Sequence, residues 1–134
     1  MCDELVIEGV DKVRLALSEL DQLDYAVVTV TAGQELHAKG RVELEERQQC
    51  GLIALFEEMA RDWRGWEGGK EWKSTDGRLK LACFHDRLGH IDLAFELRSS
   101  GLADQLEWQL QSSLWVEAGT LDGLVRRVRA FFAL

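Results

Sequence analysis

The sequence contains no proline in 134 residues, so glycine and acidic turns must mark the ends of its segments. It also lacks a continuous apolar run of the roughly 20 residues that a membrane-spanning helix needs. The beginning of the chain, Met1-Cys2-Asp3-Glu4, has none of the basic and apolar character of a signal peptide. From these absences we expect a cytoplasmic protein that does not enter a membrane.

Cysteine is scarce as well. The three cysteines, Cys2, Cys50 and Cys83, lie far apart, and no two of them form a Cys-x-x-Cys pair. An odd number without paired spacing argues against a disulfide framework and against a zinc site. We therefore expect Cys50 and Cys83 to be small buried hydrophobic residues.

Positive charge is the third shortage. The chain has 16 lysines and arginines against 24 aspartates and glutamates, which gives a net charge of −8. Such a surface repels the phosphates of nucleic acid and steers a basic protein toward it. The charge therefore predicts a basic protein partner and no nucleic acid, although many soluble proteins are equally acidic without such a partner.

The length and the 46% hydrophobic content are typical of one globular domain, residues 1–134. Apolar and polar residues alternate in segments up to residue 44, as in a meander of about four strands. From about Glu45 to Trp63 the apolar period becomes helical. Alternation returns in three segments between residues 79 and 116, and Thr120 is a suitable N-cap for a final helix.

This order, ββββ-α-βββ-α, predicts an α+β fold in which an antiparallel sheet of about seven strands packs with two amphipathic helices. Because each helix has one apolar face, the other face of the sheet is left for solvent or for binding.

Residues 63–72 concentrate three of the five tryptophans and three of the twelve glycines. Clustered indoles most often close the edge of a core, with glycine allowing the bends. On that interpretation the segment is structural. If it is instead a binding element, its indoles stack on a ligand and its rim is formed by Arg64, Glu67, Lys70 and Glu71. Its glycines do not lie between a strand and a helix, so they form no phosphate-binding loop.

Several short motifs resemble a bacterial family, the domain-of-unknown-function family 6228. They are Trp63-x-Gly65-Trp66-x-Gly68, Trp72, Leu79-Lys80-Leu81, Gly89-His90-Ile91-x-Leu93 and Val116-Glu117-Ala118-Gly119. The resemblance covers roughly Leu52 to Phe132. It implies a fold and no chemistry, since the family has no established activity. Small acidic α+β proteins of this kind are common among the immunity proteins of bacterial toxin systems, which is an analogy of fold and composition.

The candidates for catalysis gather at one predicted hairpin. His85, Asp86 and His90 bracket a tight turn, and Cys83 lies two residues before His85. Side chains two apart on a strand are roughly 7 Å apart, too far for a direct hydrogen bond between thiol and imidazole. A metal site would need His37 to join them from a distant strand. We therefore expect no catalysis and no metal or other cofactor here.

Our leading prediction is a non-enzymatic protein-binding module, an immunity-type inhibitor of a cognate toxin, present as a monomer or homodimer. The alternative is a small enzyme or small-molecule-binding module with a pocket near residues 63–72. The predicted partner contacts are the acidic residues of the first helix and the tryptophan segment: Glu45, Glu46, Glu57, Glu58, Asp62, Trp66, Glu67, Lys70 and Glu71.

Overall fold

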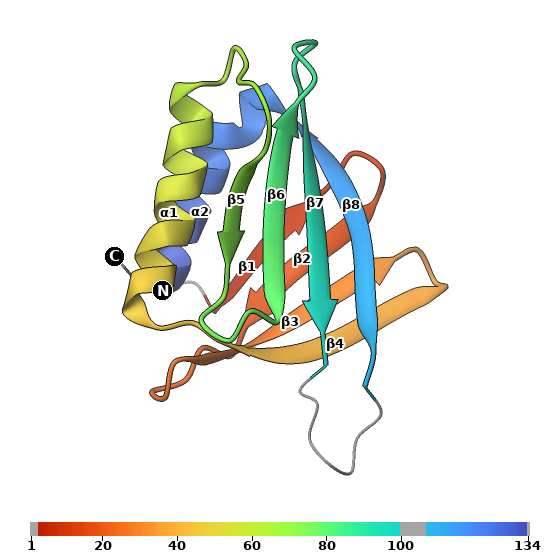
Figure 1. Ribbon diagram of the computed structural model, residues 1–134, viewed down its shortest axis with the longest axis vertical. Coiled ribbons are helices and arrows are strands. Elements are labelled where there is room, and N and C mark those ends of the chain that lie inside the picture. Colours follow the sequence, from red (N-terminus) through yellow and green to blue (C-terminus); the bar gives the residue numbers. More distant parts are fainter. Residues whose placement is uncertain (1–2, 100–106, 134) are drawn as a thin grey trace.

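The computed structural model describes residues 3–99 and 107–133 and shows two sheets and two α-helices (Figure 1). The first half of the chain forms β1 (Glu4–Glu8), β2 (Val13–Ser18), β3 (Tyr25–Ala32), β4 (Leu36–Glu43) and α1 (Glu46–Arg61). The second half repeats that order with β5 (Lys70–Lys73), β6 (Leu79–His85), β7 (His90–Arg98), β8 (Gln109–Glu117) and α2 (Leu121–Phe132). A 3-10 turn, Ala118–Thr120, precedes α2.

Each sheet is an antiparallel meander in which every strand pairs with its neighbours along the chain. Alternation assigns each residue to a face: in β6, Leu81 and Cys83 are buried while Lys80 and Phe84 are exposed. The pairing register sets Cys83 opposite Leu93 of β7, so buried residues of neighbouring strands share one face. The inner faces of the two sheets enclose the core, and the outer faces lie at the surface.

The helix that follows each sheet packs against an edge strand of the other sheet. α1 contacts β5, α2 contacts β1, and the two helices contact each other. Trp72 of β5 donates its indole N–H to the carbonyl of Gln48 in α1 over 2.9 Å. Arg127 of α2 donates to the carbonyl of Val6 in β1 over 3.3 Å. Each helix therefore covers an edge strand that would otherwise be open to pairing.

The turn after each edge strand is tied to the other sheet in the same way. In the β1–β2 turn, Val10 donates its N–H to the carbonyl of Trp115 in β8 over 2.9 Å. In the β5–β6 turn, Thr75 donates its N–H to the carbonyl of Glu43 in β4 over 2.9 Å. The two halves are thus joined by reciprocal contacts at both edges.

The close approach of the sheets explains one glycine within a strand. Gly40 lies in β4 opposite Val28, and a Cβ atom at this position would lie 3.3 Å from the side chain of Leu97. Glycine weakens a strand interior, but here it makes room for a buried leucine of the second sheet.

The α+β class, the two helices and the antiparallel pairing are confirmed. The described residues form eight strands, because the four-residue β5 is too short to show an alternating pattern. They also form two sheets instead of one, since α1 separates β4 from β5 and those strands do not pair. Within the described ranges, neither helix has the length and apolar character needed to cross a bilayer.

Candidate functional site

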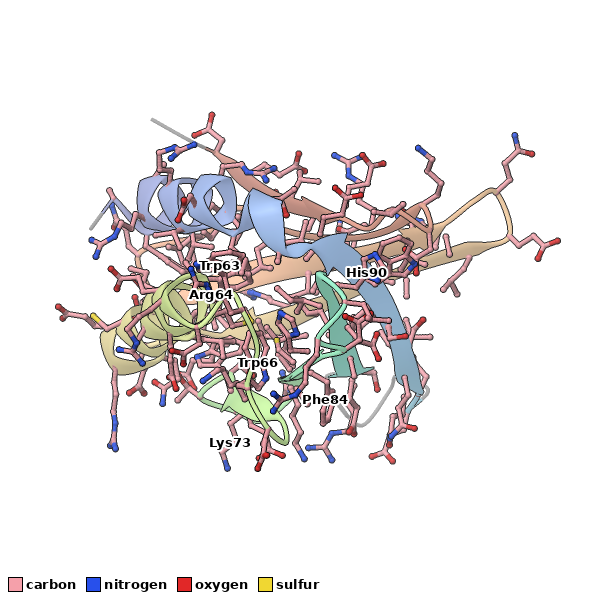
Figure 2. All side chains as sticks on the ribbon, turned by 90° about the horizontal axis from the view of Figure 1, so that it is seen from above. Trp63, Arg64, Trp66, Lys73, Phe84 and His90 are labelled. Carbon is pink, nitrogen blue, oxygen red and sulfur yellow. The ribbon has the colours of Figure 1, made fainter. Side chains whose placement is uncertain are left out.

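Three segments that are distant in the sequence meet at one end of the molecule, which Figure 2 views from above. They are the segment after α1, the β6–β7 hairpin and the junction of β8 with α2. Together they line a hollow of about 530 Å³, which we name the end hollow. Its lining residues are Trp63, Arg64, His85, Arg87, Leu88, Gly89, His90, Glu117, Ala118 and Gly119.

The end hollow brings together motifs that carried the family resemblance. Trp63 comes from the tryptophan segment, Gly89 and His90 from the hairpin, and Glu117 from the end of β8. The N–H of Ala118 donates to the carbonyl of Gly89 over 2.8 Å, which fixes the hairpin to the β8–α2 junction. The motifs lie far apart in the sequence because each belongs to a different element, and the fold brings these elements together at the end hollow.

The tryptophan segment has a buried anchor and an exposed tip. Trp66 is 9% exposed, and its indole N–H donates to the carbonyl of Cys83 over 3.1 Å. Its ring meets the ring of His85 edge-on at 5.1 Å. Trp63 is 52% exposed, with the guanidinium of Arg64 5.1 Å from its ring centre. Trp66 therefore holds the segment in place and leaves little surface for a partner, while Trp63 presents an open ring.

Gly65 allows the hairpin to approach the tryptophan segment. Its φ of +144° lies outside the range that other residues favour, and a Cβ atom there would lie 3.4 Å from Cγ of Arg87. The side chain of Arg87 therefore lies against Gly65, and Arg64 and Arg87 both line the end hollow.

The sequence suggested that Lys70 lies on the rim of the segment, but the structure places it elsewhere. Its side chain is 14% exposed, and its Nζ lies 2.7 Å from Glu58 and 3.2 Å from Asp62 at the end of α1. The reason is the strand period: Lys70 and Trp72 share the face of β5 that is turned toward α1. The hydrogen bond to Glu58 raises the pKa of Lys70, and the hydrogen bond from Lys70 lowers the pKa of Asp62.

Both ring nitrogens of His85 are engaged. Its Nδ1 accepts the N–H of Arg87 at 2.7 Å, which requires that Nε2 carries the proton and donates to the carbonyl of Trp63 at 2.8 Å. A ring held in this neutral tautomer has no free lone pair for proton abstraction. His85 therefore fixes Trp63 to the hairpin.

His90 is oriented by Asp86. Oδ2 of Asp86 lies 2.8 Å from Nδ1 of His90, while Oδ1 accepts the N–H groups of Leu88 at 2.7 Å and of His90 at 3.0 Å. Desolvation disfavours ionisation of Asp86, but these hydrogen bonds outweigh it and lower the pKa of the carboxyl. Nε2 of His90 has no partner among the described residues, and no hydroxyl, thiol or amine belongs to the lining.

The cysteines occupy different environments. Cys83 is buried, and desolvation raises the pKa of its thiol to about 12, so it is not a thiolate at neutral pH. The expectation that Cys50 is buried was wrong, because it lies on the exposed side of α1. Cys2 lies outside the described residues. No group of three histidine, cysteine or acidic side chains within residues 3–99 and 107–133 is placed to hold a metal ion, and His37 lies in β4 of the other sheet.

Three of the acidic side chains that were predicted to contact a partner form ion pairs with lysine or arginine residues of the chain itself. Glu58 and Asp62 bind Lys70, and Glu57 binds Arg129 of α2. The remaining predicted acidic contacts are exposed: Glu45, Glu46, Glu67 and Glu71. Of these, Glu67 lies beside the end hollow with its carboxylate 3.7 Å from Arg87.

Sequence reasoning missed Arg87 and Leu88 as site residues. Both were assigned to a turn, and Leu88 is 80% exposed at its tip. The available signal was an apolar residue in a hairpin turn, where polar residues are usual.

The described residues form an α+β protein with two four-stranded meanders, in which the helix that follows each sheet packs against the other sheet. We refer to this arrangement as the exchange of helices. Three of its segments meet at the end hollow. The chain belongs to DUF6228, a family of unknown function, which it matches over residues 6–134. No curated protein matches the chain.

Proposed function

We propose that the chain is a non-enzymatic protein-binding module, most concretely an immunity-type inhibitor that binds and neutralises a cognate bacterial toxin through the end hollow. The observation that carries the proposal is the exposure of two large apolar side chains there, Trp63 at 52% and Leu88 at 80%. Tryptophan and arginine dominate the binding energy of protein interfaces, and Arg64 and Arg87 frame the same hollow.

The exposed residues stand on a rigid support. His85 holds the carbonyl of Trp63, and Asp86 holds the backbone of Leu88 and the ring of His90. A surface fixed before binding loses less conformational entropy when its partner arrives, which increases affinity. The hydrogen-bonded hairpin is therefore suited to present Leu88 to a protein.

The charge of the chain supports a basic partner. The net charge of −8 steers a positively charged protein toward the chain as a whole, while Arg64 and Arg87 at the end hollow call for acidic groups at the contact itself. We locate the contact at the end hollow instead of the exposed side of α1, because Glu57, Glu58 and Asp62 are engaged by cations of the chain itself.

A second candidate function is the binding of a small molecule. It is favoured by the volume of the end hollow, about 530 Å³, which lies in the range of small-ligand sites, and by the open Nε2 of His90.

The test is affinity capture from the native cell with wild-type protein and with Trp63→Ala, Leu88→Ala and Leu23→Ala. Leu23 is a matched control, since it is 74% exposed in the turn before β3. We expect Trp63→Ala and Leu88→Ala to weaken binding of the captured protein by about tenfold or more, and Leu23→Ala by less than about twofold.

The captured protein should also arrest growth when expressed alone and lose that effect when the chain is co-expressed. Equal binding by all three variants would exclude the end hollow as the contact surface. Recovery of a bound metabolite without any protein would favour the second candidate function.

A further inference from the structure

The outer face of the second sheet carries a row of three side chains across its three long strands. Phe84 of β6 lies opposite Asp92 of β7, and Asp92 lies opposite Trp115 of β8. All three point outward, because their neighbours along each strand, such as Cys83 and Ile91, are buried. Figure 1 views this face, and neither helix lies over β6–β8.

Asp92 is an unusual residue for this position. Aspartate is depleted in strands, and Asp92 lies within the central one of these three. It forms no hydrogen bond or ion pair with any described residue. The outward positions around it supply no lysine or arginine: His90, Ala94, Ala82, Ser113 and Glu117 occupy them. The sheet thus presents an exposed carboxylate without a counter-charge.

Phe84 and Trp115 occupy the register positions on either side of this carboxylate. Phe84 is 43% exposed, and its ring lies over Gly69, where a Cβ atom would come within 2.8 Å of it. The ring of Trp115 contacts the ring of His90 edge-on at 4.7 Å. The strands that carry these two residues are two strand spacings apart, roughly 10 Å, with the exposed Asp92 between them.

The adjoining surface leaves space for the remainder of a partner. A hollow of about 720 Å³ lies over the small side chains Ala82 and Ala94, next to Asp92 on the same face. Its far end carries Lys73 and Lys80, which lie opposite each other in register. The same hollow also carries Glu71 and Glu96, so its two lysines are balanced by two carboxylates.

We infer that Phe84, Asp92 and Trp115 form a subsite for one arginine side chain of the protein partner. A guanidinium group pairs with a carboxylate through the N–H groups at its edge and stacks on aromatic rings through its flat faces, whereas an ammonium group has no flat face to stack. The inference rests on the proposed function in that it requires a protein partner, and it adds a second contact on the neighbouring sheet face.

The experiment is an NMR titration with N-acetyl-arginine amide, using its neutral isostere N-acetyl-citrulline amide as the control ligand. We expect saturable shifts of the Trp115 indole N–H and of the amides of Phe84 and Asp92, with arginine amide only. Asp92→Asn should weaken this binding about fivefold or more. Glu35→Gln, which removes one negative charge from the turn between β3 and β4, should change it by less than about twofold.

Equal shifts with citrulline amide, or equal affinities of Asp92→Asn and Glu35→Gln, would overturn the subsite. Stronger binding of N-acetyl-lysine amide would overturn the preference for a guanidinium. The amide spectra report whether each variant is folded. Failure here leaves the capture experiment with Trp63→Ala and Leu88→Ala unaffected, so the two proposals fail separately.

Discussion

Trp63 and Trp66 are three residues apart and serve different purposes. The ring of Trp66 is enclosed and donates its N–H to the carbonyl of Cys83, whereas the ring of Trp63 is half open at the end hollow. The composition of the segment is equally compatible with a structural and a binding role, and the structure divides the two roles between neighbouring tryptophans.

At this scale we predict that Trp66→Ala lowers the free energy of unfolding by about 3–5 kcal/mol, since it removes a buried aromatic side chain. Trp63→Ala should change that free energy by less than about 0.5 kcal/mol, because its ring is exposed. Urea denaturation followed by circular dichroism measures both. Equal losses for the two variants would contradict this division.

Individual side chains also show where sequence reasoning stops. The alternation between residues 79 and 116 separates the buried face of β6 and β7, which includes Leu81, Cys83 and Leu93, from their outer face. It did not reveal that both nitrogens of His85 are occupied, because one partner, the carbonyl of Trp63, is 22 residues away. Spacing predicts which face a residue occupies, but partners from other elements follow only from the tertiary structure.

Among the elements, the junction of α1 and β5 depends on one cation. Lys70 reaches from β5 to Glu58 and Asp62, and its ammonium group lies 5.2 Å from the centre of the Trp66 ring. The strand itself was missed because four residues are too few for a periodic pattern. Its position is set by contacts with α1 and β6 that the sequence does not display.

We predict that Lys70→Met destabilises the protein in a pH-dependent manner. The pKa of Lys70 is raised above 10.5, so its contribution is present below that pH and is lost as the pH rises through the raised value. The pKa of Asp62 is lowered below 3.8, so its contribution is present above that pH and is lost as the pH falls through the lowered value. The difference from wild type should be largest between these limits.

Unfolding curves from pH 2 to pH 11 test this, with Lys73→Met as the control. Lys73 lies in the same short strand but points outward. A pH-independent difference for Lys70→Met, or an equal effect of Lys73→Met, would show that the ion pairs do not stabilise the junction.

On the scale of the whole molecule, the two halves have the same order of elements and exchange their helices. The sequence predicted that order nearly completely, since periodicity is a local property. It could not predict the exchange, because an amphipathic helix has an apolar face whichever sheet it covers. α1 and α2 both have one buried face, and only the packing assigns α1 to β5 and α2 to β1.

We predict that the chain unfolds in a single transition and that residues 1–62 alone have no fixed tertiary structure, since α1 would lack β5 and β1 would lack α2. Calorimetry should give equal calorimetric and van't Hoff enthalpies for the whole chain. The fragment should show no near-ultraviolet circular dichroism. A separately stable first half, seen as two transitions, would contradict this.

The exchange of helices also determines how late in translation the first sheet receives the helix that covers its edge strand. β1 is synthesised early, but α2, which covers its edge and donates to its backbone through Arg127, follows every strand. For most of translation the first sheet therefore exposes an open edge that can pair with another nascent chain. The absence of proline means that no slow prolyl isomerisation prolongs this interval once α2 has emerged.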